Sequence, residues 1–96
     1  AGFIIKLSFT EKVKSMEKRI GVVGIVVENP DITGKINSIL HDYAELVIGR
    51  MGIPYRQRQV RVISLIVEGT TDEIGALTGK LGNLPGVSVK SALSKC

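Results

Sequence analysis

The sequence predicts an α+β fold, a ferredoxin-like βαββαβ sandwich with two helices on one face of a four-stranded antiparallel sheet. The chain has 96 residues, which suits one small domain. A β-branched run, a helix-start signal and an amphipathic segment occur in that order twice, forty residues apart: "IVVENPDITGKINSIL" (25–40) parallels "LIVEGTTDEIGALTGKL" (65–81). A further strand-like segment follows each copy, which gives the split βαβ pattern.

Four segments are expected as strands: 18–28, about 46–56, about 59–68 and 86–93. Pro54 lies in the second of them. Because proline has no N–H to donate to a sheet ladder, that strand is expected at an edge of the sheet.

Two helices are expected between these strands. Asn29 suits an N-cap with Pro30 at the first helical position, where a missing N–H costs nothing. Residues 70–73, Thr-Thr-Asp-Glu, have the spacing of a capping box. Apolar residues recur with helical spacing: Ile32, Ile36, Ile39, Leu40 and Tyr43 in the first helix, and Ile74, Leu77, Leu81 and Leu84 in the second.

The first and third strands are apolar on both sides. Two helices cover only one face of such a sheet, so these runs predict a second covering partner. We expect a second copy of the chain, in a homodimer or homotetramer; the alternative is that residues 1–15 fold over this face. One side would carry Val23, Ile25, Val27, Ile63, Leu65 and Val67, and the other Ile20, Val22, Val26, Val60, Val62 and Ile66.

Residues 1–15 are expected to be a poorly ordered leader or expression remnant, because 16–19, Met-Glu-Lys-Arg, is typical of a natural start. Residues 16–96 would then form the single domain. The alternative is an extra N-terminal strand, since apolar residues alternate with smaller or polar ones at Phe3, Ile5, Leu7 and Phe9.

Composition restricts the function further. The net charge of +4 is ordinary for a small domain, and the single cysteine, Cys96, cannot form an internal disulfide. No apolar run approaches the roughly 18 residues of a membrane span. We therefore expect a cytoplasmic protein with no cofactor, no bound metal and no membrane contact.

Three glycines form a stripe along the second expected helix, at Gly75, Gly79 and Gly82. An interior glycine costs a helix about 1 kcal/mol relative to alanine, so the stripe indicates a close approach of a backbone or a ligand. The approaching group could be the protein's own sheet or first helix, another subunit, or a small effector. Gly82 could instead end the helix as its C′ residue.

Four arginines cluster around the expected hairpin beside Tyr55: Arg50, Arg56, Arg58 and Arg61. Arginine suits phosphate and carboxylate groups, so one interpretation is an anion or nucleic-acid site. The other is that these charges protect an edge strand.

Catalytic and metal-binding patterns are weak. His41, beside Asp42 and Glu45, is interpreted as a solvated residue rather than a metal ligand. It has no serine or cysteine at a suggestive spacing, and no phosphate-binding G-x-x-x-x-G-K-[ST] loop occurs. An enzyme is therefore not expected.

The segments "IVEG" and "IGALTGKLGNLPGVSVKS" resemble the regulatory domains grouped as ACT-like, and are similar to the C-terminal domain of the nickel-responsive repressor. Together with "MEKR", "IVVE", "INSILHDY" and "RMGIPYR", they resemble the stand-alone family of iron-only (FeFe) hydrogenase system regulators, from Met16 to about Lys95. The resemblance implies control of hydrogenase gene transcription. ACT-like domains hold a small effector near the first β-α loop and a helix, which implies ligand residues at Asn29, Asp31, Gly75, Gly79 and Gly82.

The resemblance has limits. The nickel repressor binds metal through several histidines and a cysteine and carries a ribbon–helix–helix DNA-binding domain. With one His and one Cys, this chain inherits no such metal site, and direct DNA binding is not supported. We expect an oligomeric regulatory module that senses an effector or binds a partner; the alternatives are a nucleic-acid-binding protein using the Arg-rich hairpin, or a purely structural assembly module.

Overall fold

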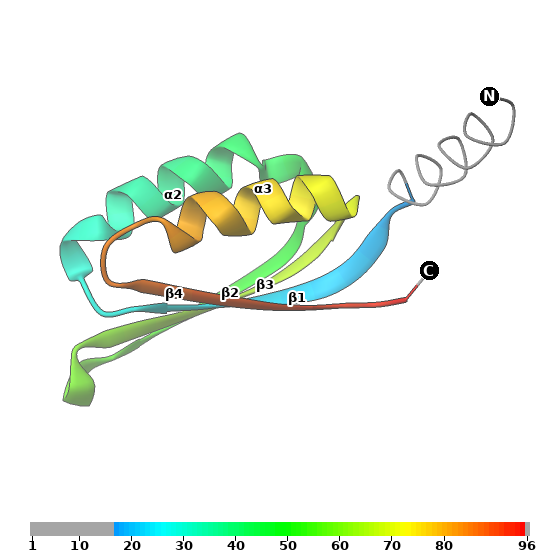
Figure 1. The fold of residues 1–96 in the computed structure, drawn as a ribbon. Coiled ribbons are helices and arrows are strands. Elements are labelled where there is room, and N and C mark those ends of the chain that lie inside the picture. Colours follow the sequence, from blue (N-terminus) through cyan, green and yellow to red (C-terminus); the bar gives the residue numbers. More distant parts are fainter. Residues whose placement is uncertain (1–16, 96) are drawn as a thin grey trace, which may run out of the picture.

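The computed structural model describes residues 17–95, and the expectations for residues 1–15 and for Cys96 lie outside this part of the chain. The sheet order is β2-β3-β1-β4, and each neighbouring pair is antiparallel. Both helices lie on one face of the sheet (Figure 1), so the predicted ferredoxin-like sandwich is confirmed. The elements are β1 (Arg19–Val27), η1 (Pro30–Ile32), α2 (Thr33–Asp42), η2 (Ala44–Leu46), β2 (Val47–Tyr55), η3 (Arg56–Arg58), β3 (Val60–Gly69), α3 (Thr71–Gly82) and β4 (Val87–Leu93).

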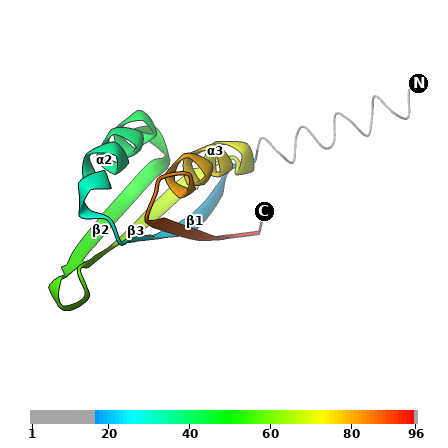
Figure 2. The ribbon, with the colours of Figure 1, turned by 60° about the vertical axis from the view of Figure 1, so that its left-hand side comes forward.

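The edge strands are β2 and β4, as Pro54 predicts for β2. A register shift between Val47 and Gly49 marks a β-bulge at the start of β2. At the other end of β2, the pairing of β2 with β3 extends past the end of β1. The last residue of β1, Val27, pairs with Arg61, whereas β2 and β3 still pair at Tyr55 and Val60. The β2–β3 hairpin therefore projects from the body of the sheet (Figure 2).

Both predicted caps are present, but only α3 begins where the sequence predicts, since α2 starts three residues later than expected. Asn29 Oδ1 accepts a hydrogen bond from the Asp31 N–H at 3.1 Å, although the first turn is the 3₁₀ helix η1 and α2 begins at Thr33. The capping box of α3 is complete, because the Thr70 N–H donates to Glu73 Oε1 at 2.9 Å and the Glu73 N–H donates to Thr70 Oγ1 at 3.1 Å. The Thr70 backbone N–H, and then its hydroxyl, hold the pKa of Glu73 below its ordinary value.

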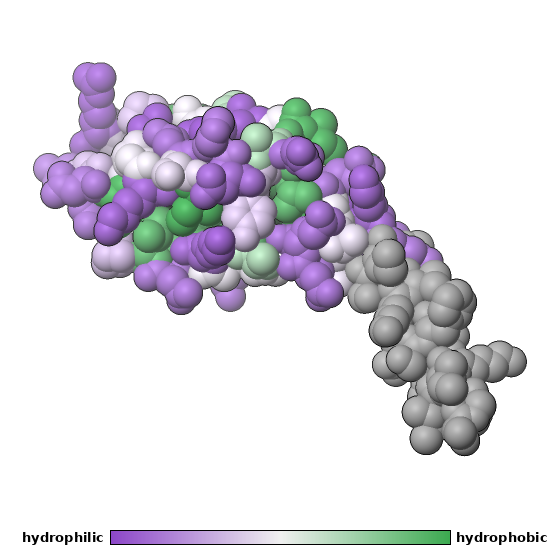
Figure 3. Space-filling model, turned by 90° about the horizontal axis from the view of Figure 1, so that it is seen from above, coloured by the Kyte–Doolittle hydropathy of each residue, from purple (hydrophilic) through white to green (hydrophobic). Residues whose placement is uncertain are grey.

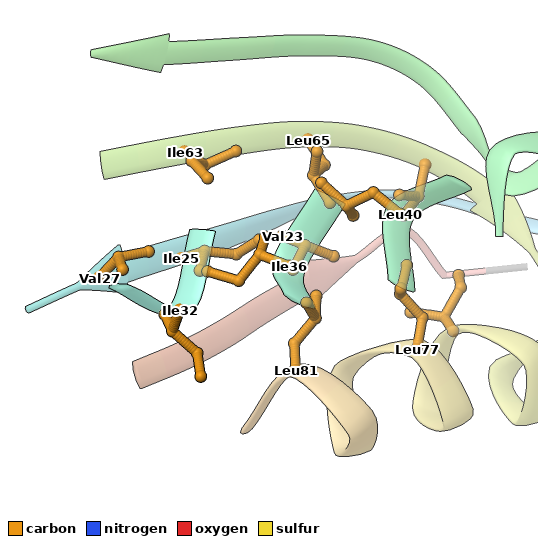
Figure 4. Close-up of a cluster of buried hydrophobic side chains, with 12 residues drawn as sticks. Val23, Ile25, Val27, Ile32, Ile36, Leu40, Ile63, Leu65, Leu77 and Leu81 are labelled. Atoms are coloured by element: carbon orange, nitrogen blue, oxygen red, sulfur yellow. The ribbon is translucent and has the colours of Figure 1, made fainter. Parts of the chain in front are cut away.

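The core lies between the helices and one face of the sheet, here called the helix-covered face. Viewed from the helix side, hydrophilic side chains cover much of the outer surface of the helices (Figure 3). Their apolar stripes point inward, where Ile36 and Leu40 of α2 and Leu77 and Leu81 of α3 meet the strands (Figure 4). The opposing strand residues are those predicted for one side of β1 and β3: Val23, Ile25, Val27, Ile63, Leu65 and Val67, all at most 2 % exposed.

Candidate ligand-binding site

A pocket of about 540 Å³ lies where the β2–β3 hairpin projects past β1. Its residues come from the β1–α2 connection and from the hairpin, two segments that are far apart in the sequence. This volume is within the range of small-molecule sites. The lining residues are Val27, Pro30, Thr33, Pro54, Tyr55, Arg56, Gln59, Val60 and Arg61.

The β1–α2 connection is held in position by the turn before β4. The Glu28 N–H donates to the Gly86 carbonyl oxygen at 2.8 Å. Gly86 has a left-handed backbone with φ 74°, and a Cβ at this position would lie only 2.9 Å from the Cβ of Asn29. Glycine is therefore required here, because it permits both the positive φ and the close approach. The contact fixes the loop that places Pro30 in the pocket lining.

A tight turn shapes the hairpin side of the pocket. Gln59 has φ 54° and ψ 41°, and its N–H donates to the Arg56 carbonyl oxygen at 3.2 Å. This left-handed residue ends η3 and returns the chain into β3. As a result Arg56, before the turn, and Arg61, after it, line the same pocket.

The pocket combines positive charge with apolar walls. Arg61 is partly buried, and its Nε has no hydrogen-bond partner among the described residues. A guanidinium stays protonated and carries only donors, so it is best satisfied by an anionic acceptor. Val27, Pro30, Pro54 and Val60 supply apolar surface beside it. The arrangement suits a small molecule that carries a phosphate or carboxylate group on an apolar body.

The structure places the four predicted arginines in different surroundings. Arg56 and Arg61 line the pocket, whereas Arg58 is exposed in η3 and is not among the lining residues. Arg50 lies on the helix side of β2, where its Nη2 donates to Asn37 Oδ1 of α2 at 2.7 Å. The predicted cluster is therefore not one continuous site.

The residues predicted around the first β-α loop do not meet the glycine stripe. Asn29 and Asp31 flank the lining residue Pro30 but do not line the pocket themselves. The observed role of Asn29 is to cap η1. Their part in ligand binding stays a prediction.

The glycine stripe is free of contacts with the part of the chain that the structure describes. A Cβ at Gly75, Gly79 or Gly82 would meet none of these residues within 4 Å, so packing of the stripe against the protein's own sheet or α2 is wrong as an explanation. Gly82 is not a C′ residue either, because it is the last residue of α3 and the cap is Asn83. A contact of the stripe with a subunit or an effector stays a prediction.

His41 lies at a second, smaller hollow of about 250 Å³, which is lined by Leu40, His41, Ala44, Val47, Arg50 and Leu65. Within residues 17–95, the structure contains no group of three or more His, Cys, Asp and Glu side chains that could hold a metal ion. In the same range, no helix is long and apolar enough to span a membrane.

The second face of the sheet, here called the open face, is apolar and uncovered by other described residues. Register places Val22 of β1 beside Ile66 of β3, and Ile53 of β2 beside Val62 of β3. Their exposed fractions are between 40 and 54 %, although Val22, Val62 and Ile66 alternate with buried residues of β1 and β3. The exposed apolar residues of the open face are Ile20, Val22, Met51, Ile53, Tyr55, Val62 and Ile66.

Some of the comparisons with known proteins show only the fold of this chain, and others show its family. A homoserine dehydrogenase from Thiobacillus denitrificans matches at 18 % identity and a TM-score of 0.57, over 83 % of this chain and 18 % of its own. A formyltetrahydrofolate deformylase from Pseudomonas putida matches at 11 % identity and a TM-score of 0.56, over 76 % of this chain and 28 % of its own. At these identities both matches show the fold alone. A comparison with curated protein sequences gives no match.

Two further matches are specific. The TM1266-like family model, described as "Iron-only hydrogenase system regulator, putative", matches residues 19–91. The structure of the uncharacterized protein TM1266 from Thermotoga maritima matches at 38 % identity and a TM-score of 0.78, over 82 % of this chain and 100 % of its own. The chain therefore belongs to the TM1266-like family of iron-only hydrogenase system regulators.

Proposed function

We propose that this domain regulates the iron-only hydrogenase system by binding a small anionic effector in the pocket between the β1–α2 connection and the β2–β3 hairpin. The observation that carries the proposal is the pocket itself, in which Arg56 and Arg61 lie beside apolar walls. The expected ligand class is a phosphate or carboxylate group on an apolar body.

The proposed role is regulatory and cytoplasmic, without catalysis. An effector regulates a protein when its binding changes the interactions of that protein with a partner. A ligand in this pocket would contact both the β1–α2 connection and the β2–β3 hairpin. Its binding would therefore change how these two segments are held relative to each other. Since direct DNA binding is not expected, an effect on transcription would pass through a partner protein.

The proposed module also associates with copies of itself. The open face supports this, because exposed apolar patches of this kind mark interaction surfaces. A homodimer is the simplest assembly that would cover it.

Nucleic-acid binding through the hairpin is the weaker alternative. Single-stranded nucleic acid requires a continuous basic groove with aromatic platforms. Here Arg50 pairs with Asn37 on the helix side, while Arg58 lies at the hairpin tip. These positions do not favour one basic track.

The effector site can be tested with phenyl phosphate and benzoate as probes, and inorganic phosphate as the anion without an apolar body. At a probe concentration of about ten times the dissociation constant, binding adds about 1.4 kcal/mol to the free energy of unfolding. For a domain of this size that corresponds to a rise in Tm of at least about 5 °C. We expect phenyl phosphate or benzoate to produce this rise and inorganic phosphate to produce a smaller one.

Arg61→Met is expected to abolish the shift, and Arg56→Met to reduce it. Arg58→Met is the matched control, because it removes the same charge from the same hairpin outside the pocket lining. An equal loss in the Arg58 variant would show a non-specific charge effect, and no shift of the wild type with any probe would refute the effector site.

A further inference from the structure

The open face is large enough to form a stable interface. Its strands run from Tyr55 and Val60 at one end to Glu68 and Ile20 at the other. With strands about 4.8 Å apart and a rise of about 3.3 Å per residue, the face measures roughly 20 by 25 Å in projection. The accessible area of its side chains exceeds that projection and approaches the roughly 800 Å² per partner of a standard protein–protein interface.

The shape of the open face suits another sheet. The middle row of the face dips at its centre, where Gly24 of β1 pairs with Ser64 of β3 between Met51 of β2 and Lys90 of β4. Bulky residues border this row on both sides, with Val22 and Ile66 on one side and Val26 and Val62 on the other. A face with ridges and a trough can interdigitate with a second apolar sheet face, as in sheet-on-sheet packing.

Charge favours a second copy of this chain as the occupant. Register puts two charged residues on the open face, Glu68 on β3 and Lys90 on β4, which carry opposite signs. They belong to different rows and strands of one molecule. In a dimer with a two-fold axis, Glu68 of each copy can lie beside Lys90 of the other copy. The interface would then contain two such pairs of opposite charges.

Growth of the sheet at its β2 edge is a weaker alternative. Pro54 removes a donor from that edge, and the bulge at Val47 and Gly49 disturbs its ladder. Of the exposed apolar residues of β2, Met51, Ile53 and Tyr55 belong to the open face, together with those of β1 and β3. Face-to-face packing therefore covers more apolar surface.

The open face and the pocket share residues. Tyr55 and Val60 form the last row of the open face at the hairpin, and both also line the pocket. Tyr55 is 48 % exposed in the single chain. A second copy on the open face would restrict Tyr55 and exclude water from that side of the pocket.

We propose that two copies pack with their open faces together, and that this dimer binds the anionic effector more tightly than the monomer does. The coupling rests on the proposed function, because it requires an effector in the pocket. Coupling between two equilibria is reciprocal, so the effector must also strengthen the dimer by the same factor. The effector concentration would thus determine which fraction of the domain is dimeric.

The interface is tested by sedimentation equilibrium of the full chain. We expect a wild-type dimer, and at least a tenfold higher dimer dissociation constant for Ile66→Lys with an unchanged circular dichroism spectrum. Ser38→Lys is the matched control: it adds the same charge to an exposed position of α2 and should leave the dimer intact. A monomeric wild type, or an unaffected Ile66→Lys dimer, would overturn the proposed interface.

A charge exchange tests whether the occupant is a second copy. Glu68→Lys and Lys90→Glu should each weaken the dimer, and the double variant should recover most of the wild-type affinity. A double variant as weak as the two singles combined would overturn the proposed pairing of Glu68 with Lys90.

Coupling is tested by repeating the sedimentation with phenyl phosphate. We expect a severalfold lower dimer dissociation constant in the wild type, and none of this change in Arg61→Met. If phenyl phosphate binds without changing dimerisation, the coupling is wrong although the effector site stands. If neither phenyl phosphate nor benzoate binds, the proposed effector site and the coupling are both wrong. The proposed dimer is then tested by the sedimentation of the Ile66, Glu68 and Lys90 variants alone.

Discussion

The two faces of the sheet carry similar side chains in different surroundings. On β3, Leu65 is fully buried beneath the helices, whereas the next residue, Ile66, is 40 % exposed on the open face. Both strands at the centre of the sheet repeat this alternation of two apolar sides. The helix-covered face is covered by α2 and α3 of the same chain, whereas the open face has no such cover among residues 17–95. Apolar patterning therefore defines what must be covered, while the connections of the chain decide what covers it.

The largest expected effect is that of truncating Leu65 on the helix-covered face, and it is compared with truncation of Ile66 on the open face. Leu65→Ala should lower the free energy of unfolding by about 2–5 kcal/mol, because it removes buried methyl groups and leaves a cavity. Ile66→Ala should lower it by about 1 kcal/mol or less in the monomer. Urea denaturation at a protein concentration below the dimer dissociation constant measures both. Equal losses would mean that the open face is already covered within one chain.

Two glycines of β1 make the same comparison through added volume. Gly21→Ala should cost about 1–3 kcal/mol, because its Cβ would overlap Leu93 and lie 2.7 Å from the Ala92 carbonyl oxygen. Gly24 is on the open face, and its Cβ would come no closer than 3.9 Å to Lys90 O, so Gly24→Ala should change stability by about 0.5 kcal/mol or less. Thermal unfolding of both variants checks this; a neutral Gly21→Ala would contradict the close approach of β4.

The smallest effect tests the outer surface of α3. Gly79→Ala should raise the free energy of unfolding by about 0.5–1 kcal/mol, because alanine is the better helix former and its Cβ meets none of residues 17–95 within 4 Å. Effector binding and dimerisation should stay unchanged if the stripe is a plain solvent surface. A more stable variant that no longer binds would instead show that the glycines admit a partner.

Local signals in the sequence predicted most of the fold. Strand ends agree within one residue, since the β-branched runs, Pro54 and the two cap motifs act over short distances. The site was predicted less completely. The loop at 28–31 and the hairpin arginines appeared as two separate candidates, and their meeting at one pocket depends on how far β2 and β3 extend past β1. Among the other lining residues, Val27, Thr33 and Val60 carry no local signal for such a site.

The glycines illustrate the same limit. The regular spacing of Gly75, Gly79 and Gly82 suggested close packing, yet the tight approaches within the described chain occur at Gly21, Gly69 and Gly86. Gly86 contacts Asn29 across a long stretch of sequence. Helical spacing identifies which glycines share one side of a helix, but it cannot tell whether anything lies against that side.

The projecting hairpin has a consequence for how this domain can change over evolutionary time. Residues 54–59 are all exposed and contribute nothing to the buried core, yet four of them line the pocket. Substitutions there can accumulate with little loss of folding stability. The preference of the proposed effector site can therefore diverge between relatives while the same sandwich is inherited, because the hairpin residues of the pocket and the residues of the core are separate sets.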